Sequence, residues 1–249
     1  MNYQIIELEK CDSTNTEALK LIDKNKELAE WTIIYTENQT SGRGRGKNKW
    51  FSEPYKNITF SVILKPNFLP LCNIFYLFKV SAISIVNSLK QFSENIKIKW
   101  PNDIYFEKYK LGGVLIENIL YNSEIKYSVI GIGINVNQVD FFKYNLNATS
   151  LKRIINSEKD IDLKKLLHTI LTELYYWYNE LKHNNYNKLN KHYKENLLGY
   201  KQQIELFVHS KNENIIGEIY DVLDNGILVF KENNNFYYFD IDEVEFLLK

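Results

Sequence analysis

The segment 42–47, Gly-Arg-Gly-Arg-Gly-Lys, places glycines and cations at alternate positions. Glycine costs roughly 0.5 to 1 kcal/mol relative to alanine inside a helix or strand, and neighbouring unpaired cations repel one another. We therefore predict a loop, not a helix or an ordinary strand, whose backbone N–H and guanidinium groups bind an anion. Arg43 and Arg45 would share one side of an extended loop and could span a carboxylate and a phosphate.

Bringing a carboxylate to the α-phosphorus of a nucleotide is a reaction that such a loop could promote. The two reactants repel each other, and more negative charge develops in the transition state. Fixed cations offset this charge and are commonly worth several kcal/mol. The candidate cations are Arg43, Arg45, Lys47 and Lys110. Asp103 is a candidate Mg²⁺ ligand, since proteins usually hold this ion with one or two carboxylates plus phosphate oxygens.

Other polar and aromatic residues extend this hypothesis. Asn102 and Asn135, at predicted strand ends, could read the edge of a base, and Trp50 could stack on it. The Ser-Thr-Asn segment 13–15 caps a predicted helix or cradles a compact polar ligand. The chain has neither Walker A spacing nor a Ser-His-Asp or Cys-His set, and its histidines lack zinc-site spacing. Positioning and electrostatics would therefore carry the chemistry.

Glycines also interrupt two predicted strands. Gly112 and Gly113 lie near the start of one, and Gly131 and Gly133 lie two residues apart on one face of another. Such glycines mark bulges and tight packing, or a surface against which a ligand lies. Together with the loop, they favour a ligand lying on a sheet.

Hydrophobic periodicity predicts an α+β domain over residues 1–197, with a mixed sheet flanked by helices. Thr14 and Glu17 have capping-box spacing at the start of its first helix. Short alternating strands and an Asp-Asn-Gly hairpin at 224–226 predict a small SH3-like β-barrel over 198–249 that docks on the first domain. The expected strands are 3–8, 31–36, 57–65, 96–100, 104–106, 110–117, 127–136, 203–208, 215–220, 227–230 and 236–239, and the later helices are 74–92, 163–181 and 186–197.

The composition limits the classes of protein. The 249 residues include 31 basic and 31 acidic side chains, so the chain lacks the basic excess of a general nucleic-acid binder. Two cysteines, Cys11 and Cys72, and no signal peptide favour a reduced, cytoplasmic setting. The richest apolar stretch, 74–86, is interrupted by Lys79 and is expected to be too short to span a bilayer.

Taken together, these motifs resemble those of the biotin protein ligases (biotin-[acetyl-CoA carboxylase] ligases), in the family's order. The matching motifs are Ser13-Thr14-Asn15, Gln39, Gly42-Arg43-Gly44-Arg45-Gly46, Trp50, Lys99-Trp100-Pro101-Asn102-Asp103, Lys110-Leu111-Gly112-Gly113 and Gly131-Ile132-Gly133-Ile134-Asn135.

The resemblance implies a class II synthetase-like catalytic domain and a two-step reaction. Biotin and ATP form biotinyl-5'-adenylate and pyrophosphate, and the adenylate then acylates a lysine of a biotin carboxyl carrier protein domain. The implied catalytic residues are Arg43, Arg45 and Lys110. The implied biotin-binding residues are Ser13, Thr14, Asn15, Gln39, Arg43, Gly44, Arg45, Lys110, Gly112 and Gly113. Arg45, Lys47, Trp50, Asn102 and Asn135 would bind ATP, with Asp103 near Mg²⁺.

Two departures from the family pattern qualify this expectation. Some members carry an N-terminal helix-turn-helix, and the few residues before Ser13 leave no room for one, so no DNA binding is expected. Some members also have a third arginine where Gly46 stands, and Lys47 is the nearest cation here. We expect no membrane association and a monomer or weak homodimer.

Two alternative functions stay open. A lipoate protein ligase is similar in fold and reaction, and the glycine-arginine loop with Gln39 favours biotin over lipoate. A nucleic-acid-binding module would use the cations of segment 43–49 for phosphates and Trp50 for a base. The neutral overall charge argues against this second alternative.

Overall fold

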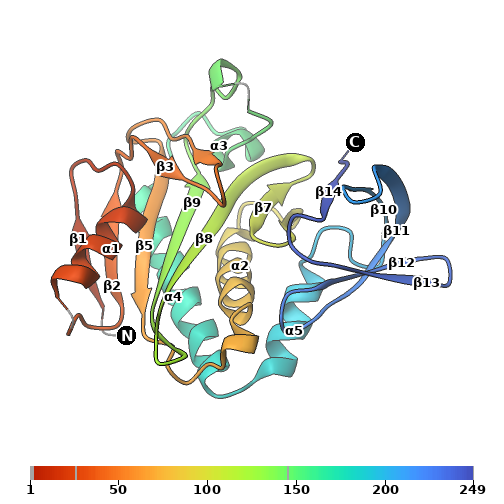
Figure 1. Cartoon of the computed structure of the whole chain (residues 1–249). Coiled ribbons are helices and arrows are strands. Elements are labelled where there is room, and N and C mark those ends of the chain that lie inside the picture. The colour runs from red at the N-terminus through yellow and green to blue at the C-terminus, as the bar shows by residue number, and fades with distance from the viewer. Residues whose placement is uncertain (1–2, 26, 145, 249) are drawn as a thin grey trace.

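The computed structural model describes residues 3–25, 27–144 and 146–248. Its central element is a seven-stranded sheet in the order β1-β2-β5-β9-β8-β7-β6 (Figure 1). β1 and β2 are parallel, and the other neighbours are antiparallel, so the predicted mixed sheet is confirmed. The strands are β1 (Gln4–Glu7), β2 (Thr32–Thr36), β5 (Asn57–Leu64), β9 (Glu124–Asn135), β8 (Tyr109–Tyr121), β7 (Asp103–Phe106) and β6 (Ile96–Lys99).

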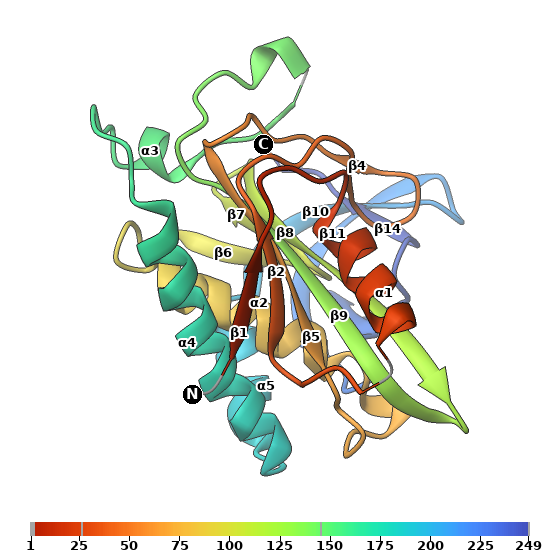
Figure 2. The same ribbon diagram turned by 90° about the vertical axis from the view of Figure 1, so that its left-hand side faces the viewer.

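Helices cover both faces of this sheet. Successive strand residues point to opposite faces, and apolar residues on each face pack against helices. On β2, Ile34 packs with Ala18 and Ile22 of α1 (Thr14–Lys24), whereas Ile33 and Tyr35 join the larger cluster on the other face. That face is covered by α2 (Tyr76–Leu89) and α4 (Leu163–Lys182), and α5 (Tyr186–Glu195) packs against these two helices (Figure 2). Three short helices complete the domain: η1 (Leu71–Asn73), η2 (Phe142–Tyr144) and α3 (Leu151–Ile154).

The start of α1 differs from the prediction. The helix begins at Thr14, and Ser13 is the extended N-cap residue. The predicted capping box is therefore wrong. The Thr14 hydroxyl contacts Gln39 and Ser61 instead. Its side chain therefore makes tertiary contacts and does not provide the helix cap that the local spacing predicts.

The glycine-arginine segment is a small hairpin, not the strand-free loop that we expected. β3 (Gly42–Arg43) pairs with β4 (Lys49–Trp50), with Gly42 opposite Trp50. Gly46 in the turn has a φ of 62°, which is a conformation that glycine adopts without steric cost.

The C-terminal residues form an antiparallel five-stranded sheet in the order β13-β12-β11-β10-β14. Among the described residues no pairing joins β13 to β14. The predicted small C-terminal β module is therefore confirmed as an antiparallel sheet, and no closed barrel is seen. The strand β14 was not predicted, and its three residues are too few to show alternation. The strands are β10 (Gln203–Val208), β11 (Glu213–Val222), β12 (Leu228–Glu232), β13 (Asn235–Phe239) and β14 (Val244–Phe246).

This C-terminal sheet docks on α2 and α5 through the turn between β11 and β12. The Trp100 indole N–H donates to the Gly226 carbonyl at 3.0 Å, and a Cβ on Gly226 would lie 2.6 Å from the Phe75 ring. Buried residues of both parts belong to one apolar cluster. The division at residues 197 and 198 therefore stays a prediction about chain organisation, and the packed core runs across it.

One helical run among the described residues, Leu71–Leu89, is long and apolar enough to cross a membrane by length and composition. The stretch 74–86, which we expected to be too short to span a bilayer, lies inside this longer run. Two thirds of the run, 67%, is buried inside the protein, which agrees with the predicted role of a core helix.

Candidate functional site

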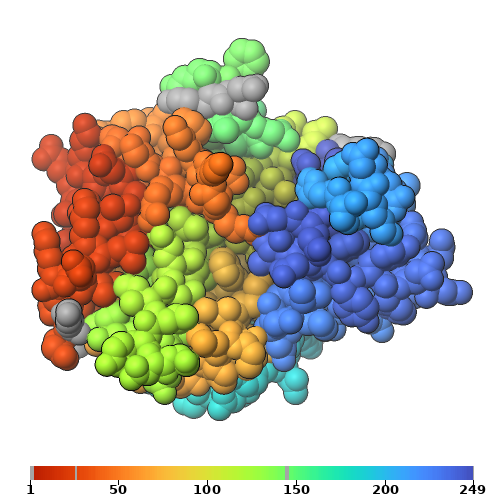
Figure 3. All heavy atoms as spheres, viewed as in Figure 1, coloured from red at the N-terminus to blue at the C-terminus, as the bar shows by residue number. Residues whose placement is uncertain are grey.

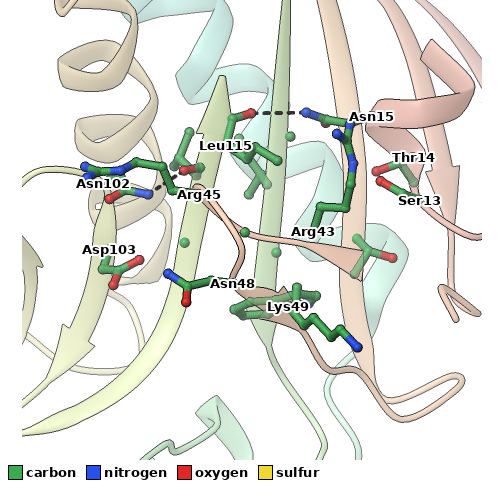
Figure 4. Close-up of a pocket in the computed structure, with 18 of the residues that line it drawn as sticks. Ser13, Thr14, Asn15, Arg43, Arg45, Asn48, Lys49, Asn102, Asp103 and Leu115 are labelled. Carbon is green, nitrogen blue, oxygen red and sulfur yellow. Dashed lines mark hydrogen bonds between the residues drawn. The ribbon is translucent and has the colours of Figure 1, made fainter. Parts of the chain in front are cut away.

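A cavity of about 220 Å³ opens between the β3–β4 hairpin, the start of α1 and strands β8 and β9. Most of the predicted site residues line it (Figure 4). They are Ser13, Thr14, Asn15, Gln39, Arg43, Gly44, Arg45, Trp50, Asn102, Asp103, Lys110 and Gly113.

Three predicted residues lie outside this lining. Lys47 is exposed at the hairpin turn, and Asn135 is buried at the end of β9 opposite Asn57. A Cβ on Gly112 would meet the Ile134 side chain at 2.6 Å. Close packing of β8 on β9 is therefore the observed reason for glycine at position 112, and the ligand-binding roles of these three residues stay predictions.

The polar end of the cavity is a connected hydrogen-bond network. Gln39 Oε1 accepts from the Thr14 backbone N–H at 2.9 Å. Ser61, fully buried on β5, lies 2.7 Å from the Thr14 hydroxyl and 2.6 Å from Asn15 Oδ1. The Asn15 amide in turn donates to Glu117 Oε2 at 2.9 Å. Three residues of the predicted biotin site therefore hold one another in place.

The two arginines of the hairpin extend to different carboxylates. Arg43 donates to both Glu117 oxygens, at 3.1 and 2.5 Å, and Arg45 pairs with Asp242 of the C-terminal sheet. In Figure 4 Arg43 lies beside Asn15, and Arg45 lies beside Asn102. The hairpin is thus tied to the central sheet at one arginine and to the C-terminal sheet at the other.

Asp103 and Lys110 form an ion pair of 2.7 Å at the cavity wall. The neighbouring Lys99 is half-buried, and its partial burial lowers the pKa of its ammonium, an effect that Asp103 opposes and Lys110 reinforces. Opposite charges at this wall therefore compensate one another before any ligand binds.

Trp50 lies over Gly133, where a Cβ would come within 2.6 Å of the indole ring. The indole Nε1 is buried and has no hydrogen-bond partner among the described residues. An orphaned buried donor usually costs free energy, and here it borders the cavity, where a ligand acceptor could satisfy it.

Residues 8–135 of this chain match the biotin/lipoate A/B protein ligase family. The chain belongs to this family. The matched range contains most of the cavity lining, including the β3–β4 hairpin and the Asp103–Lys110 pair.

Two comparisons describe this family membership more closely. The bifunctional ligase/repressor BirA of Bacillus spizizenii is 34% identical over 175 residues, which cover 69% of this chain and 52% of the relative. The chain thus spans about half the length of this curated relative. The structure of a biotin protein ligase from Aquifex aeolicus in complex with biotin and ATP is 25% identical, with a TM-score of 0.79 over 99% of both chains.

Asp103, the predicted magnesium ligand, contacts a lysine in this structure. Asp103 pairs with Lys110, and Asp242, the other cavity-lining carboxylate, pairs with Arg45. In the described part of the chain no group of three or more His, Cys, Asp or Glu side chains is arranged to hold a metal ion. Asp103 alone would supply one carboxylate, which suits a Mg²⁺ ion whose other ligands are phosphate oxygens, and its role as a Mg²⁺ ligand stays a prediction.

Sequence reasoning missed several residues of the site. Ser61, Glu117 and Asp242 carry no local motif, and they come near the cavity only through strand pairing and docking of the C-terminal sheet. Gly131 and Gly133, which the sequence placed on one face of a strand beside a ligand, also line the cavity. The remaining lining residues, which were not predicted, are Asn48, Lys49, Thr59, Pro101, Val114, Leu115 and Ile132.

Proposed function

We propose that the protein is a biotin protein ligase that activates biotin with ATP and transfers it to a lysine of a biotin carboxyl carrier domain. One observation carries this proposal. A single cavity combines an uncharged polar network at Thr14, Asn15 and Gln39 with the cations Arg45 and Lys110. The first set suits a compact polar ring, and the second suits a carboxylate next to a phosphate.

In the first step an oxygen of the biotin carboxylate attacks the α-phosphorus of ATP. The bond from this phosphorus to the bridging oxygen breaks, and pyrophosphate leaves. Lys110 and Arg45 reduce the repulsion between the two anions and stabilise the charge that develops in the transition state. Asp103 keeps the Lys110 ammonium directed along the cavity wall through their 2.7 Å pair.

In the second step the neutral amine of a carrier lysine attacks the carbonyl carbon of the adenylate, the bond to the AMP oxygen breaks so that AMP leaves, and the amine nitrogen releases its proton to solvent. The described cavity lining contains no His or Cys and therefore no Ser-His-Asp or Cys-His set, so in this proposal positioning of the two reactants supplies the rate enhancement. Magnesium enters this proposal as the partner of the ATP phosphates, where it would neutralise their charge, with Asp103 as the nearest candidate carboxylate.

The remaining expectations belong to the same proposal. The carrier domain is the macromolecular partner, the reaction takes place in the cytoplasm, and neither DNA nor a membrane takes part. The enzyme acts as a monomer or a weak homodimer. Lipoate is the competing substrate, and the relative that was solved with biotin and ATP favours biotin.

The test is pyrophosphate release from the purified protein with ATP and Mg²⁺, in the presence of biotin or of lipoate. We expect pyrophosphate release in the reaction that contains biotin and no release in the reaction that contains lipoate. Release that requires lipoate and ignores biotin would assign the protein to the lipoate branch of the family.

Lys110→Ala tests the role of the cation in this assay. Loss of a charge-assisted contact should raise the barrier by about 1.5 to 3 kcal/mol or more. Lys108→Ala, in the turn between β7 and β8, is the matched control and should retain the wild-type rate. Equal rates for both variants would contradict the role of Lys110.

A further inference from the structure

Glu117 on β8 is the end point of the polar network, although it carries no motif and lies outside the cavity lining. Its Oε2 accepts from the Asn15 amide at 2.9 Å and from Arg43 at 2.5 Å, and its Oε1 accepts from Arg43 at 3.1 Å. One carboxylate thus contacts the start of α1 and the β3–β4 hairpin, which form two walls of the cavity.

An ionised carboxylate accepts hydrogen bonds and cannot donate them. The Asn15 amide must therefore turn its NH₂ group toward Glu117, where Nδ2 also lies 3.4 Å from the Leu115 carbonyl. Its oxygen then faces Ser61, whose Oγ is 2.6 Å away. Glu117 fixes which side of this amide is the donor.

The orientation of the Asn15 amide also determines which hydroxyl donates each of the next hydrogen bonds. Ser61 has one hydroxyl proton, and this proton must go to the Asn15 oxygen, because two bare acceptors would otherwise face each other at 2.6 Å. The Thr14 hydroxyl has one proton and two neighbouring acceptors, Ser61 Oγ at 2.7 Å and Gln39 Oε1 at 3.3 Å. Because the Ser61 proton goes to Asn15, the shorter of these two contacts takes the Thr14 proton, and the Thr14 oxygen has only lone pairs left for the cavity.

We propose that Glu117 is a positioning residue that sets the hydrogen-bond polarity of this wall, so that Thr14 presents an acceptor to an N–H group of the ligand. The inference rests on the proposed function, in which this group is an N–H of the biotin ring. Ser61 relays the effect, and neither Ser61 nor Glu117 lines the cavity.

Glu117→Gln and Ser61→Ala test this proposal. A glutamine both donates and accepts, so it no longer enforces the orientation of the Asn15 amide. Ser61→Ala interrupts the chain and leaves the Arg43–Glu117 pair intact. The matched control is Glu124→Gln, an exposed carboxylate at the start of β9. The measurements are the affinity for biotin alone by isothermal titration and the KM values for biotin and ATP in pyrophosphate release.

We expect both variants to lose about tenfold or more in biotin affinity, as is usual when a hydrogen bond involving a charged group is lost. In Ser61→Ala, which keeps the Arg43–Glu117 pair, the KM for ATP and the kcat should stay within about twofold of wild type, and Glu124→Gln should match wild type throughout. Wild-type biotin affinity in either variant would overturn the proposal. An equal rise in both KM values would also overturn it, since that indicates a general structural defect.

The two levels of inference fail in different ways. If the wild-type protein neither binds biotin nor releases pyrophosphate with it, the proposed function is wrong. If the wild-type protein does both and the two variants behave like it, only the role of Glu117 is wrong.

Discussion

At the scale of single residues, Gly131 shows how closely the polar network and the sheet fit together. A Cβ at this position would lie 2.1 Å from Asn15 Oδ1, a distance that no real contact allows. The absence of a side chain on β9 thus leaves the space that the Asn15 amide occupies between Ser61 and Glu117.

Gly131→Ala should therefore displace the Asn15 amide and disturb the wall that we assign to biotin. We expect a loss of about 1 to 3 kcal/mol in the free energy of unfolding, as for other overpacked sites, together with weaker biotin binding. Urea denaturation and biotin titration measure the two effects. Gly46→Asn is the control, since nothing lies within 4 Å of a Cβ there and asparagine tolerates a positive φ. Unchanged biotin affinity in Gly131→Ala would show that the amide can move without consequence.

The site residues that the sequence predicted are those inside contiguous motifs. Segment 42–47 is recognisable from its unusual composition, and residues 13–15 are recognisable from their position at the start of a predicted helix. Glu117 and Ser61 do not, because alternation along a strand tells which residues share a face but not which side chain of another element they meet. The pairing of Arg43 with Glu117 and of Arg45 with Asp242 could not be predicted for the same reason.

At the scale of elements, α2 carries a buried lysine at its contact with the C-terminal sheet. Lys79 Nζ donates to Asn190 Oδ1 at 2.8 Å and to the Leu223 carbonyl at 3.2 Å, and it lies 3.9 Å from Asp224. Burial lowers the pKa of Lys79 from 10.5 to about 8, and the charge of Asp224 partly opposes this shift. In the sequence this residue interrupts an apolar run, and in the structure it fastens two elements together.

The pKa of Lys79 gives a prediction for the pH dependence of stability. Between about pH 8 and 10.5 the unfolded chain binds more protons at this residue than the folded chain does. The free energy of unfolding therefore rises with pH in this window, by roughly 3 kcal/mol at most, and this contribution is constant below pH 8.

Lys79→Met keeps a long side chain and removes this titration. The difference in unfolding free energy between wild type and Lys79→Met should shift in favour of wild type as the pH rises from 8 to 10. Denaturant unfolding at fixed pH values measures it. A difference that is independent of pH would show that Lys79 keeps its ordinary pKa in the fold.

At the scale of the whole molecule, the C-terminal sheet completes both the core and the cavity. It supplies Gly226 to the surface around Phe75 and Trp100, and it supplies Asp242 to Arg45. In Figure 3 the blue C-terminal region abuts the orange segment that contains the β3–β4 hairpin. A region that composition marks as separate is thus a structural part of the site.

A chain that ends at residue 197 should therefore fail to fold stably. Truncation exposes apolar side chains of α2 and α5 that now belong to a cluster shared with the C-terminal sheet, and such exposure costs roughly 25 cal/mol for each Å². Circular dichroism and size-exclusion chromatography would detect the loss. Asp242→Asn in the full chain is the control: it breaks one exposed ion pair, which is worth about 1 kcal/mol or less, and should stay folded. A soluble, cooperatively unfolding 1–197 fragment would contradict this prediction.

Most of the whole-molecule plan could be predicted from the sequence, because long periodic segments define the sheet and helices in order. Strand β14 could not be predicted. β14 is a three-residue strand whose pairing with β10 depends on the docked chain rather than on its own pattern. The choice of α1, rather than another helix, for the second face of the sheet likewise follows from packing.

The half-buried indole of Trp50 gives this protein an optical reporter of its own. The other three tryptophans, Trp31, Trp100 and Trp177, lie in the core with at most 6% of their surface exposed, whereas Trp50 borders the cavity. Biotin or ATP should therefore change the intrinsic emission through Trp50, and Trp50→Phe should remove most of that change. A titration followed at the emission maximum would then report occupancy of the site without a label, and an undiminished change in Trp50→Phe would place the optical response elsewhere in the fold.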